Sequence, residues 1–120
     1  MEALSITIEK QADLQNTHTV HFEGDFDGGS AEHVTELESL IGSAAPKTTL
    51  IFDFSKLNFL NSYAIGQLVQ WHTQLKKKEG SIVITGTNKN VQDIFAIVGI
   101  HNLFRIFPSL SAALQALKNK

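Results

Sequence analysis

The sequence predicts one α/β domain, residues 1–120, whose elements run in the order ββαβαβαβα. Strand-like apolar runs alternate with periodic helical segments from residue 17 onward, and the connections between them are no longer than about seven residues. A chain of 120 residues also suits a single core. Because strands that alternate with helices are joined by crossovers, we expect a largely parallel sheet after an antiparallel first pair.

Five segments have the patterning of strands. The first two alternate apolar and polar residues, which is typical of strands that are buried on one face. The third follows Pro46 and is almost continuously apolar, so we expect it at the centre of the sheet with both faces covered. The five segments are 4–10, 17–25, 48–55, 81–86 and 103–107.

Four further segments have helical periodicity: 30–42, 62–80, 91–99 and 108–117. Ser30 and Ser109 are candidate N-caps of the first and last helices. The second helix is expected to be the longest and to end at the run Lys76–Lys77–Lys78–Glu79–Gly80, whose cations suit a helix C-terminus. Its apolar face is expected to comprise Ile65, Leu68, Val69, His72 and Leu75.

Composition excludes several classes of function. Ten basic and twelve acidic residues leave a net charge of −2, which offers no general attraction for nucleic acid. There is no run of apolar residues long enough for a signal peptide or a membrane span, so the expected location is the cytoplasm. The absence of cysteine rules out disulfides, thiolate nucleophiles and cysteine zinc sites.

Signatures of catalysis and of cofactor binding are also missing. The five histidines form no HExxH motif or paired set, so we expect no metal site, no cofactor and no enzymatic activity. His72 is expected to be a partly buried histidine bonded to backbone or water. Gly24, Gly28 and Gly29 leave open a small-ligand or nucleotide-binding turn, although they form no known phosphate-binding motif.

The stretch FLNSYAIGQL, residues 59–68, passes at once from a strand to a helix. Either Asn61 or Ser62 can accept hydrogen bonds from the unpaired amides of the first helical turn. The same position, at the end of a central strand, is where open α/β sheets place functional loops, and a phosphate on Ser62 would be tolerated beside a helix N-terminus. Trp71 on this helix is expected either to pack against a neighbour or, if exposed, to anchor a partner.

The run TTLIFDFSKLNFLNSYAIGQL, residues 48–68, resembles the signature of the STAS family, which bacterial anti-sigma factor antagonists share with sulphate transporters. In that family an apolar strand ending in Asp-x-Ser leads to an apolar pair, Asp-Ser-x-Gly and a helix. Asp53 and Ser55 match the strand end, and Ser62 matches the serine that is phosphorylated in the family. The segments 22–31 and 81–114 resemble other parts of the family pattern, so the resemblance covers nearly the whole chain.

The resemblance implies a mixed sheet of four or five strands with about four helices, packed mainly on one side. It implies a non-enzymatic bacterial signalling protein that regulates transcription as an anti-sigma factor antagonist. Such a protein binds an anti-sigma factor or serine kinase, is released when Ser62 is phosphorylated, and does not insert in a membrane. The resemblance leaves a weak homodimer open. The partner-binding residues it implies are Asp27, Asn61, Tyr63, Ala64, Gln67 and Trp71.

Two residues depart from the family pattern. Asn61 stands where the family usually has aspartate, and Ala64 stands where it usually has glycine. These departures favour an alternative in which the domain is a constitutive accessory subunit of a transport or signalling assembly and is not phosphorylated.

Overall fold

We describe the protein from a computed structural model, which covers residues 3–29 and 34–119. The five strands form one sheet in the order β1-β2-β3-β4-β5, so each strand lies beside its neighbours in the sequence. The strands are β1 (Ser5–Lys10), β2 (Thr17–Phe26), β3 (Thr49–Leu60), β4 (Ser81–Thr85) and β5 (Arg105–Phe107). The mixed five-stranded sheet confirms the predicted α/β class.

The pairing directions agree with the prediction. β1 and β2 are antiparallel, with Thr7 opposite His21, and every later pair is parallel. β3 is the central strand, as its apolar run predicts. The register between β2 and β3 shifts after His21, where Asp53 is its partner but Lys56 is the partner of Glu23.

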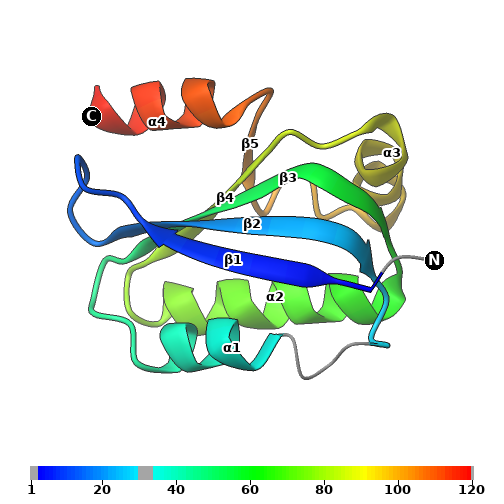
Figure 1. Cartoon of the computed structure of the whole chain (residues 1–120), viewed down its shortest axis with the longest axis horizontal. Helices are drawn as coiled ribbons and strands as arrows, with labels where there is room; N and C mark the ends of the chain where they lie inside the picture. Colours follow the sequence, from blue (N-terminus) through cyan, green and yellow to red (C-terminus); the bar gives the residue numbers. More distant parts are fainter. Residues whose placement is uncertain (1–2, 30–33, 120) are drawn as a thin grey trace.

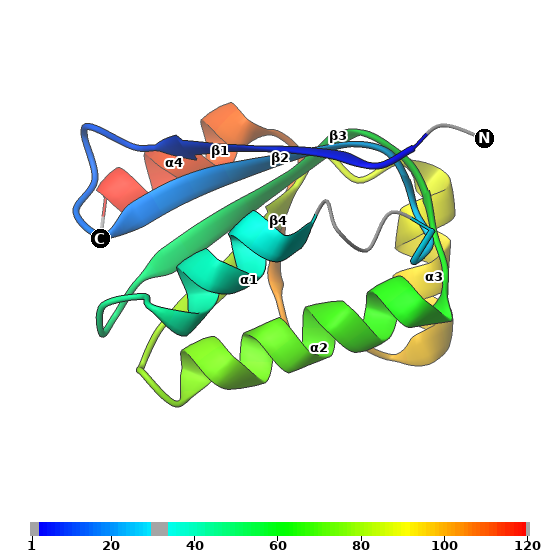
Figure 2. The ribbon, with the colours of Figure 1, turned by 60° about the horizontal axis from the view of Figure 1, so that its bottom comes forward.

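Four helices cover the sheet: α1 (Thr35–Gly42), α2 (Ser62–Lys76), α3 (Lys89–Val98) and α4 (Leu110–Lys118). Helices α1 and α2 lie side by side under one face, whereas α4 lies on the other (Figure 1, Figure 2). Ser109 caps α4 as predicted, since its hydroxyl accepts from the amide of Ala112 at 3.1 Å. The predicted cap Ser30 lies outside the described residues.

The main core fills the space between the sheet and helices α1, α2 and α3. At its centre the indole of Trp71 stacks on the ring of Phe26, with centroids 5.9 Å apart, and meets the ring of Phe52 edge-on at 6.0 Å. A second, much smaller cluster of Ile51, Val83 and Ala113 lies under α4. The two faces of β3 therefore differ greatly in how much apolar surface they bury.

The buried stripe of α2 differs from the predicted one. It consists of Ala64, Leu68, Trp71 and Leu75, whereas Ile65, Val69 and His72 lie at its half-buried side. The stripe is rotated because α2 faces the sheet with the side that carries the indole. His72 is half-buried, as predicted, and packs edge-on against Phe104 at 5.3 Å; its Nδ1 has no hydrogen-bond partner among the described residues, so the predicted bond to backbone or water stays a prediction.

The lysine run after α2 serves a neighbouring helix more than its own. Lys78 Nζ donates to three carbonyl oxygens at the C-terminus of α1, those of Ile41, Gly42 and Ala44, at 3.0–3.3 Å. Because helix C-termini leave carbonyls unpaired, this ammonium group satisfies the end of α1. Close packing, and not helix capping, requires a glycine at position 80. A Cβ there would lie 2.5 Å from the carbonyl oxygen of Thr48.

Candidate functional site

The site is built where two turns meet at one end of the sheet. The turn after β2 and the turn between β3 and α2 are joined by backbone and side-chain hydrogen bonds. The amide of Asn61 donates to the carbonyl of Phe26 at 3.3 Å, and Asn61 Nδ2 donates to the carbonyl of Asp27 at 3.1 Å. Residues far apart in the sequence are thereby held as one surface.

Asn61 is also the N-cap of α2. Its backbone is extended, and its Oδ1 accepts from the amide of Ala64 at 3.2 Å. One carboxamide therefore uses its acceptor for the helix and its donor for the neighbouring turn. An aspartate could cap the helix equally well, but it has no proton to donate to the Asp27 carbonyl.

Ser62 is the first residue of α2 and its side chain is exposed. With Asn61 acting as the cap, the Ser62 hydroxyl makes no hydrogen bond to another described residue. Two aromatic side chains near it in the sequence are also exposed, Phe59 by 44% and Tyr63 by 39%. The serine is thus accessible and has exposed aromatic residues close to it in the sequence, of which sequence analysis did not single out Phe59.

Tyr63 also closes the turn after β2. Gly28 has a φ of +89°, and a Cβ at this position would lie 3.1 Å from the ring carbons of Tyr63. The Asp27 carboxylate accepts from the amide of Gly29 at 2.9 Å, which holds the turn in shape. Among the described residues, the crevice around Gly28 is too narrow for a water molecule.

The residues expected to bind a partner separate into two groups. Asp27, Asn61, Tyr63 and Gln67 are half-buried or exposed, and the first three lie around Ser62 through the contacts above. Ala64 and Trp71 are buried, with 0% and 1% of their surface exposed, so neither can touch a partner in this conformation. Of the two alternatives expected for Trp71, the structure shows packing inside the protein. The methyl group of Ala64 also contributes to the core.

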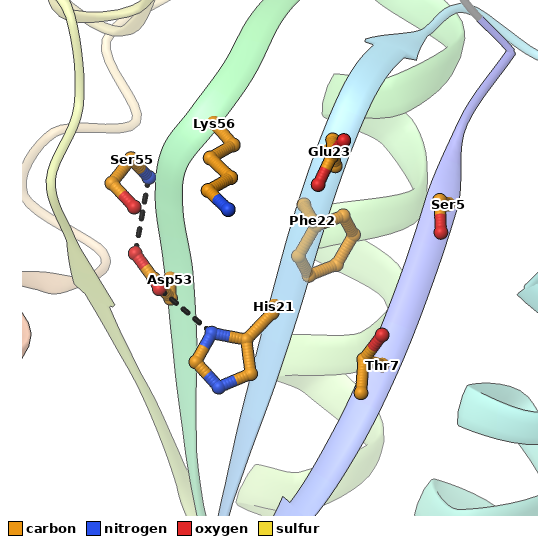
Figure 3. Close-up of a pocket in the computed structure, with 8 residues that line it drawn as sticks. All are labelled: Ser5, Thr7, His21, Phe22, Glu23, Asp53, Ser55 and Lys56. Carbon is orange, nitrogen blue, oxygen red and sulfur yellow. Dashed lines mark hydrogen bonds and ion pairs between the residues drawn. The ribbon is translucent and has the colours of Figure 1, made fainter.

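A second polar cluster lies on the opposite face of the sheet (Figure 3). His21 Nδ1 lies 2.7 Å from Asp53 Oδ2, and its Nε2 lies 3.2 Å from Glu9 Oε1. Asp53 Oδ1 accepts from the amide of Ser55 at 3.0 Å. Sequence analysis missed this cluster because its three charged residues come from three strands and meet only through the register.

Protonation in this cluster is set by the contacts. Partial burial alone would lower the pKa of His21, but hydrogen bonds to Asp53 and Glu9, with their negative charge, outweigh it and raise the pKa. Burial alone would raise the pKa of Asp53, but bonds from Ser55 and His21 outweigh it and lower the pKa. In contrast, burial and the nearby Lys76 lower the pKa of His72.

The described residues contain no group of three or more histidine, cysteine or acidic side chains arranged to hold a metal ion. No helix in the described part of the chain is long and apolar enough to cross a membrane.

The comparisons with known proteins agree with this geometry. The family model of the STAS domain matches residues 7–113. The chain belongs to the STAS family. This confirms the resemblance to the STAS family that the sequence predicts.

Solved STAS structures share the fold across almost the whole chain. The anti-sigma factor antagonist SpoIIAA in its unphosphorylated form is 15% identical, with a TM-score of 0.74 and coverage of 97% of this chain and 100% of that one. An anti-sigma factor antagonist from Mycobacterium paratuberculosis is 19% identical, with a TM-score of 0.79 and coverage of 97% and 95%. At sequence identities this low, the similarity shows that the fold is shared and does not show a shared function.

A transport-related protein is similar to the same degree. The sulfate transporter family protein from Wolinella succinogenes is 17% identical, with a TM-score of 0.74 and coverage of 88% of each chain. STAS proteins are generally non-enzymatic regulators, and the fold does not by itself separate the antagonist from the transporter type.

Proposed function

We propose that this STAS protein is a protein-binding regulator of the anti-sigma factor antagonist type, switched by phosphorylation of Ser62. The observation that carries the proposal is the exposed Ser62 hydroxyl at the N-terminus of α2, which makes no hydrogen bond to another residue that the structure describes. A kinase can reach this hydroxyl without unfolding the domain. Asn61, which acts as the cap in its place, leaves the serine free to react.

The proposed docking surface comprises Asp27, Phe59, Ser62, Tyr63 and Gln67. Exposed aromatic side chains provide most of the binding energy in many protein interfaces, and Phe59 and Tyr63, which precede and follow the serine in the sequence, offer such anchors. Asp27 gives this surface a negative charge, which suits a partner with basic residues at the same place. The partner is expected to be an anti-sigma factor or a serine kinase.

Phosphorylation would change this surface without changing the fold. A phosphoserine carries close to two negative charges, and the free amides and the dipole at the start of α2 favour an anion there. In a complex, the same dianion would be buried beside the apolar anchors and near Asp27. Desolvation and repulsion would then weaken binding, which is the proposed switch.

The two departures from the family pattern are compatible with this proposal. The Asn61 amide ties the serine turn to the Asp27 turn, which supports a surface that is ordered before a partner arrives. The methyl of Ala64 points into the core and leaves the docking surface unobstructed. Neither residue therefore blocks access to Ser62.

The test is phosphorylation by the host's own kinase. The purified protein is incubated with ATP and a lysate of its host, re-isolated, and measured by intact mass and peptide mapping. We expect one phosphate on Ser62 that disappears in Ser62→Ala. The matched control is Ser111→Ala, because Ser111 is an exposed serine in the first turn of α4 on the opposite side of the sheet. Unmodified wild type, or a phosphate retained in Ser62→Ala, would refute the switch.

A second candidate function is a constitutive accessory subunit of a transport or signalling assembly. It is favoured by the similarity to the sulfate transporter family protein. The two candidates differ in the effect of Ser62→Asp on a partner captured from the host. The switch predicts at least about tenfold weaker binding, or about 1.4 kcal/mol, whereas a constitutive subunit predicts equal binding by both forms.

Small-ligand binding at the glycine turn gains no support. The ring of Tyr63 occupies the space above Gly28, and the crevice that the described residues form there is too narrow for a water molecule. A thermal shift of the protein with nucleotides would test this alternative, and no shift is expected.

A further inference from the structure

The Glu9–His21–Asp53 cluster joins three neighbouring strands on the sheet face opposite α1 and α2. Each residue comes from a different strand: Glu9 from β1, His21 from β2 and Asp53 from β3. β1 is the edge strand of the sheet that the described residues form, in which it pairs with β2 alone. The cluster therefore adds a side-chain connection between the edge strand and the centre of the sheet.

The chemistry of the two contacts requires a proton. Both ring nitrogens of His21 face carboxylate oxygens, which can only accept when ionised. Only the imidazolium form has an N–H at both nitrogens. Neutral imidazole can donate to one carboxylate, and its other nitrogen then places a lone pair against the second.

The two contacts are unequal. The bond to Asp53 is 2.7 Å long and its carboxylate side chain is 14% exposed, whereas the bond to Glu9 is 3.2 Å long and that side chain is 61% exposed. Asp53 is also held in place by the amide of Ser55. When His21 loses its proton, the remaining N–H should stay on Asp53, and Glu9 should be released.

The other charged residues near His21 do not form a second link between β1 and the sheet centre in place of the Glu9–His21–Asp53 contacts. Thr7, the residue opposite His21 on β1, is neutral, and Lys56 of β3 and Glu23 of β2 line the same hollow, which has a volume of about 230 Å³. The side chain of Lys56 approaches this hollow from β3 (Figure 3). The hollow thus contains one further acid and one further base, and neither is hydrogen-bonded to His21.

We propose that His21 is a proton-dependent tie that holds the edge strand β1 to the rest of the sheet. The inner side of β1 carries Ile6 and Ile8, which are only partly buried against the main core. Loss of the tie would raise the frequency with which β1 separates from β2. Local opening of this kind exposes the edge of β2 and the two isoleucines without global unfolding.

The direction of the pH effect follows from His21. A histidine whose pKa is higher in the folded state contributes stability below its unfolded value, near 6.5, and that contribution is lost as the pH rises through the folded value. β1 should therefore be held more firmly at pH 6 than at pH 8. Protonation of Asp53 would release the tie in acid, and the hydrogen bonds that lower the pKa of this carboxyl move that release to a lower pH than for a free aspartate.

The experiment is amide hydrogen exchange of the whole chain between pH 5.5 and about 8.5, corrected for the intrinsic rates, with a histidine titration by NMR. We expect protection of the β1 amides to fall about threefold to tenfold across this range, while protection in β4 stays constant. Glu9→Gln should remove most of the pH dependence in β1, and the His21 resonance should titrate at a lower pH in that variant.

The matched control is Glu23→Gln, because Glu23 is an exposed acid in the same hollow without a bond to His21. It should leave the wild-type pH profile of β1 in place. Three results would each overturn the proposal: no change in β1 protection in wild type, the same change in Glu9→Gln, or a parallel change in β4. Glu9 is largely exposed, so its replacement keeps the fold intact for this comparison.

Discussion

The two faces of the sheet are stabilised by different physics. On one face, β2, β3 and β4 pack against α1, α2 and α3 through a continuous core with Trp71 at its centre. On the other face, α4 covers only a small cluster around Ile51 and Val83, and the uncovered part of β1 to β3 carries the Glu9–His21–Asp53 cluster. The first face depends on buried area, whereas the second depends on charge and protonation.

Ser62, the proposed phosphorylation site, lies on the helix that packs against the main core. α2 is anchored along its length by buried residues, from Ala64 to Leu75, so the serine at its first position is presented by a fixed helix. The polar face has less packing to hold its edge strand. In the two proposals, partner binding therefore uses a fixed surface around Ser62, whereas the response to pH uses the less firmly packed strand β1.

The largest expected difference between the two faces comes from core truncation. Trp71→Ala should lower the free energy of unfolding by about 3–5 kcal/mol, because it leaves a cavity between Phe26 and Phe52. Leu114→Ala under α4 should cost only about 1–2 kcal/mol, since that side chain is half-buried. Urea unfolding of both variants measures this, and equal losses would contradict the proposed contrast.

A smaller loss of stability is expected from removing the contact between the turn after α2 and the C-terminus of α1. Lys78→Met keeps the aliphatic stem but removes the three hydrogen bonds to the α1 C-terminus, so it should cost about 1–2 kcal/mol. Lys77→Met is the control, because Lys77 is exposed and adjacent, and it should stay within about 0.5 kcal/mol of wild type. A similar loss in both variants would show that the charge of the run matters more than its contacts.

On the polar face, the expected effect depends on pH. Asp53→Asn removes the stronger partner of His21, so unfolding experiments at pH 6 should show a loss of no more than about 1 kcal/mol, because the histidine is partly exposed. At pH 8 the loss attributable to the protonated histidine should be smaller, since that contribution disappears as the pH rises through the raised pKa. A loss that grows with pH would have the wrong sign for this mechanism.

The smallest effect is expected at the far end of the polar face, where Lys118 Nζ lies 3.3 Å from Asp13 Oδ2. Both side chains are largely exposed, so Lys118→Met should change the free energy of unfolding, measured by urea unfolding, by less than about 0.5 kcal/mol. A measurable loss would show that α4 needs this pair to remain docked.

Most of the fold could be predicted because local patterns are decisive for single elements. Period-two alternation identified β1 and β2, and Ser109 marked the start of α4. β3 continues to Leu60, five residues beyond the apolar segment 48–55, and so joins that segment to the strand end that the stretch 59–68 predicts just before the helix. In this segment, pairing with β2 extends the strand as far as Leu60.

The site could be predicted only in part. The turn around Ser62 has a linear signature and the serine is exposed, while its role as a phosphate acceptor stays a prediction. The helix face that carries Trp71 has the spacing of a surface anchor and of a core residue alike, so only the packing of α2 shows that the indole is buried. The donor role of Asn61 required the position of Asp27, which lies 34 residues away in the chain.

The sequence by itself determined the order of the elements, the central strand and the serine at the start of the longest helix, because these depend on residues close together in the chain. Tertiary structure alone decided which face of α2 is buried, that Asn61 joins two turns, that Lys78 serves α1, and that His21 lies between two acids. The physical reason is that register and helix docking bring together groups whose separation in sequence carries no signal of their contact.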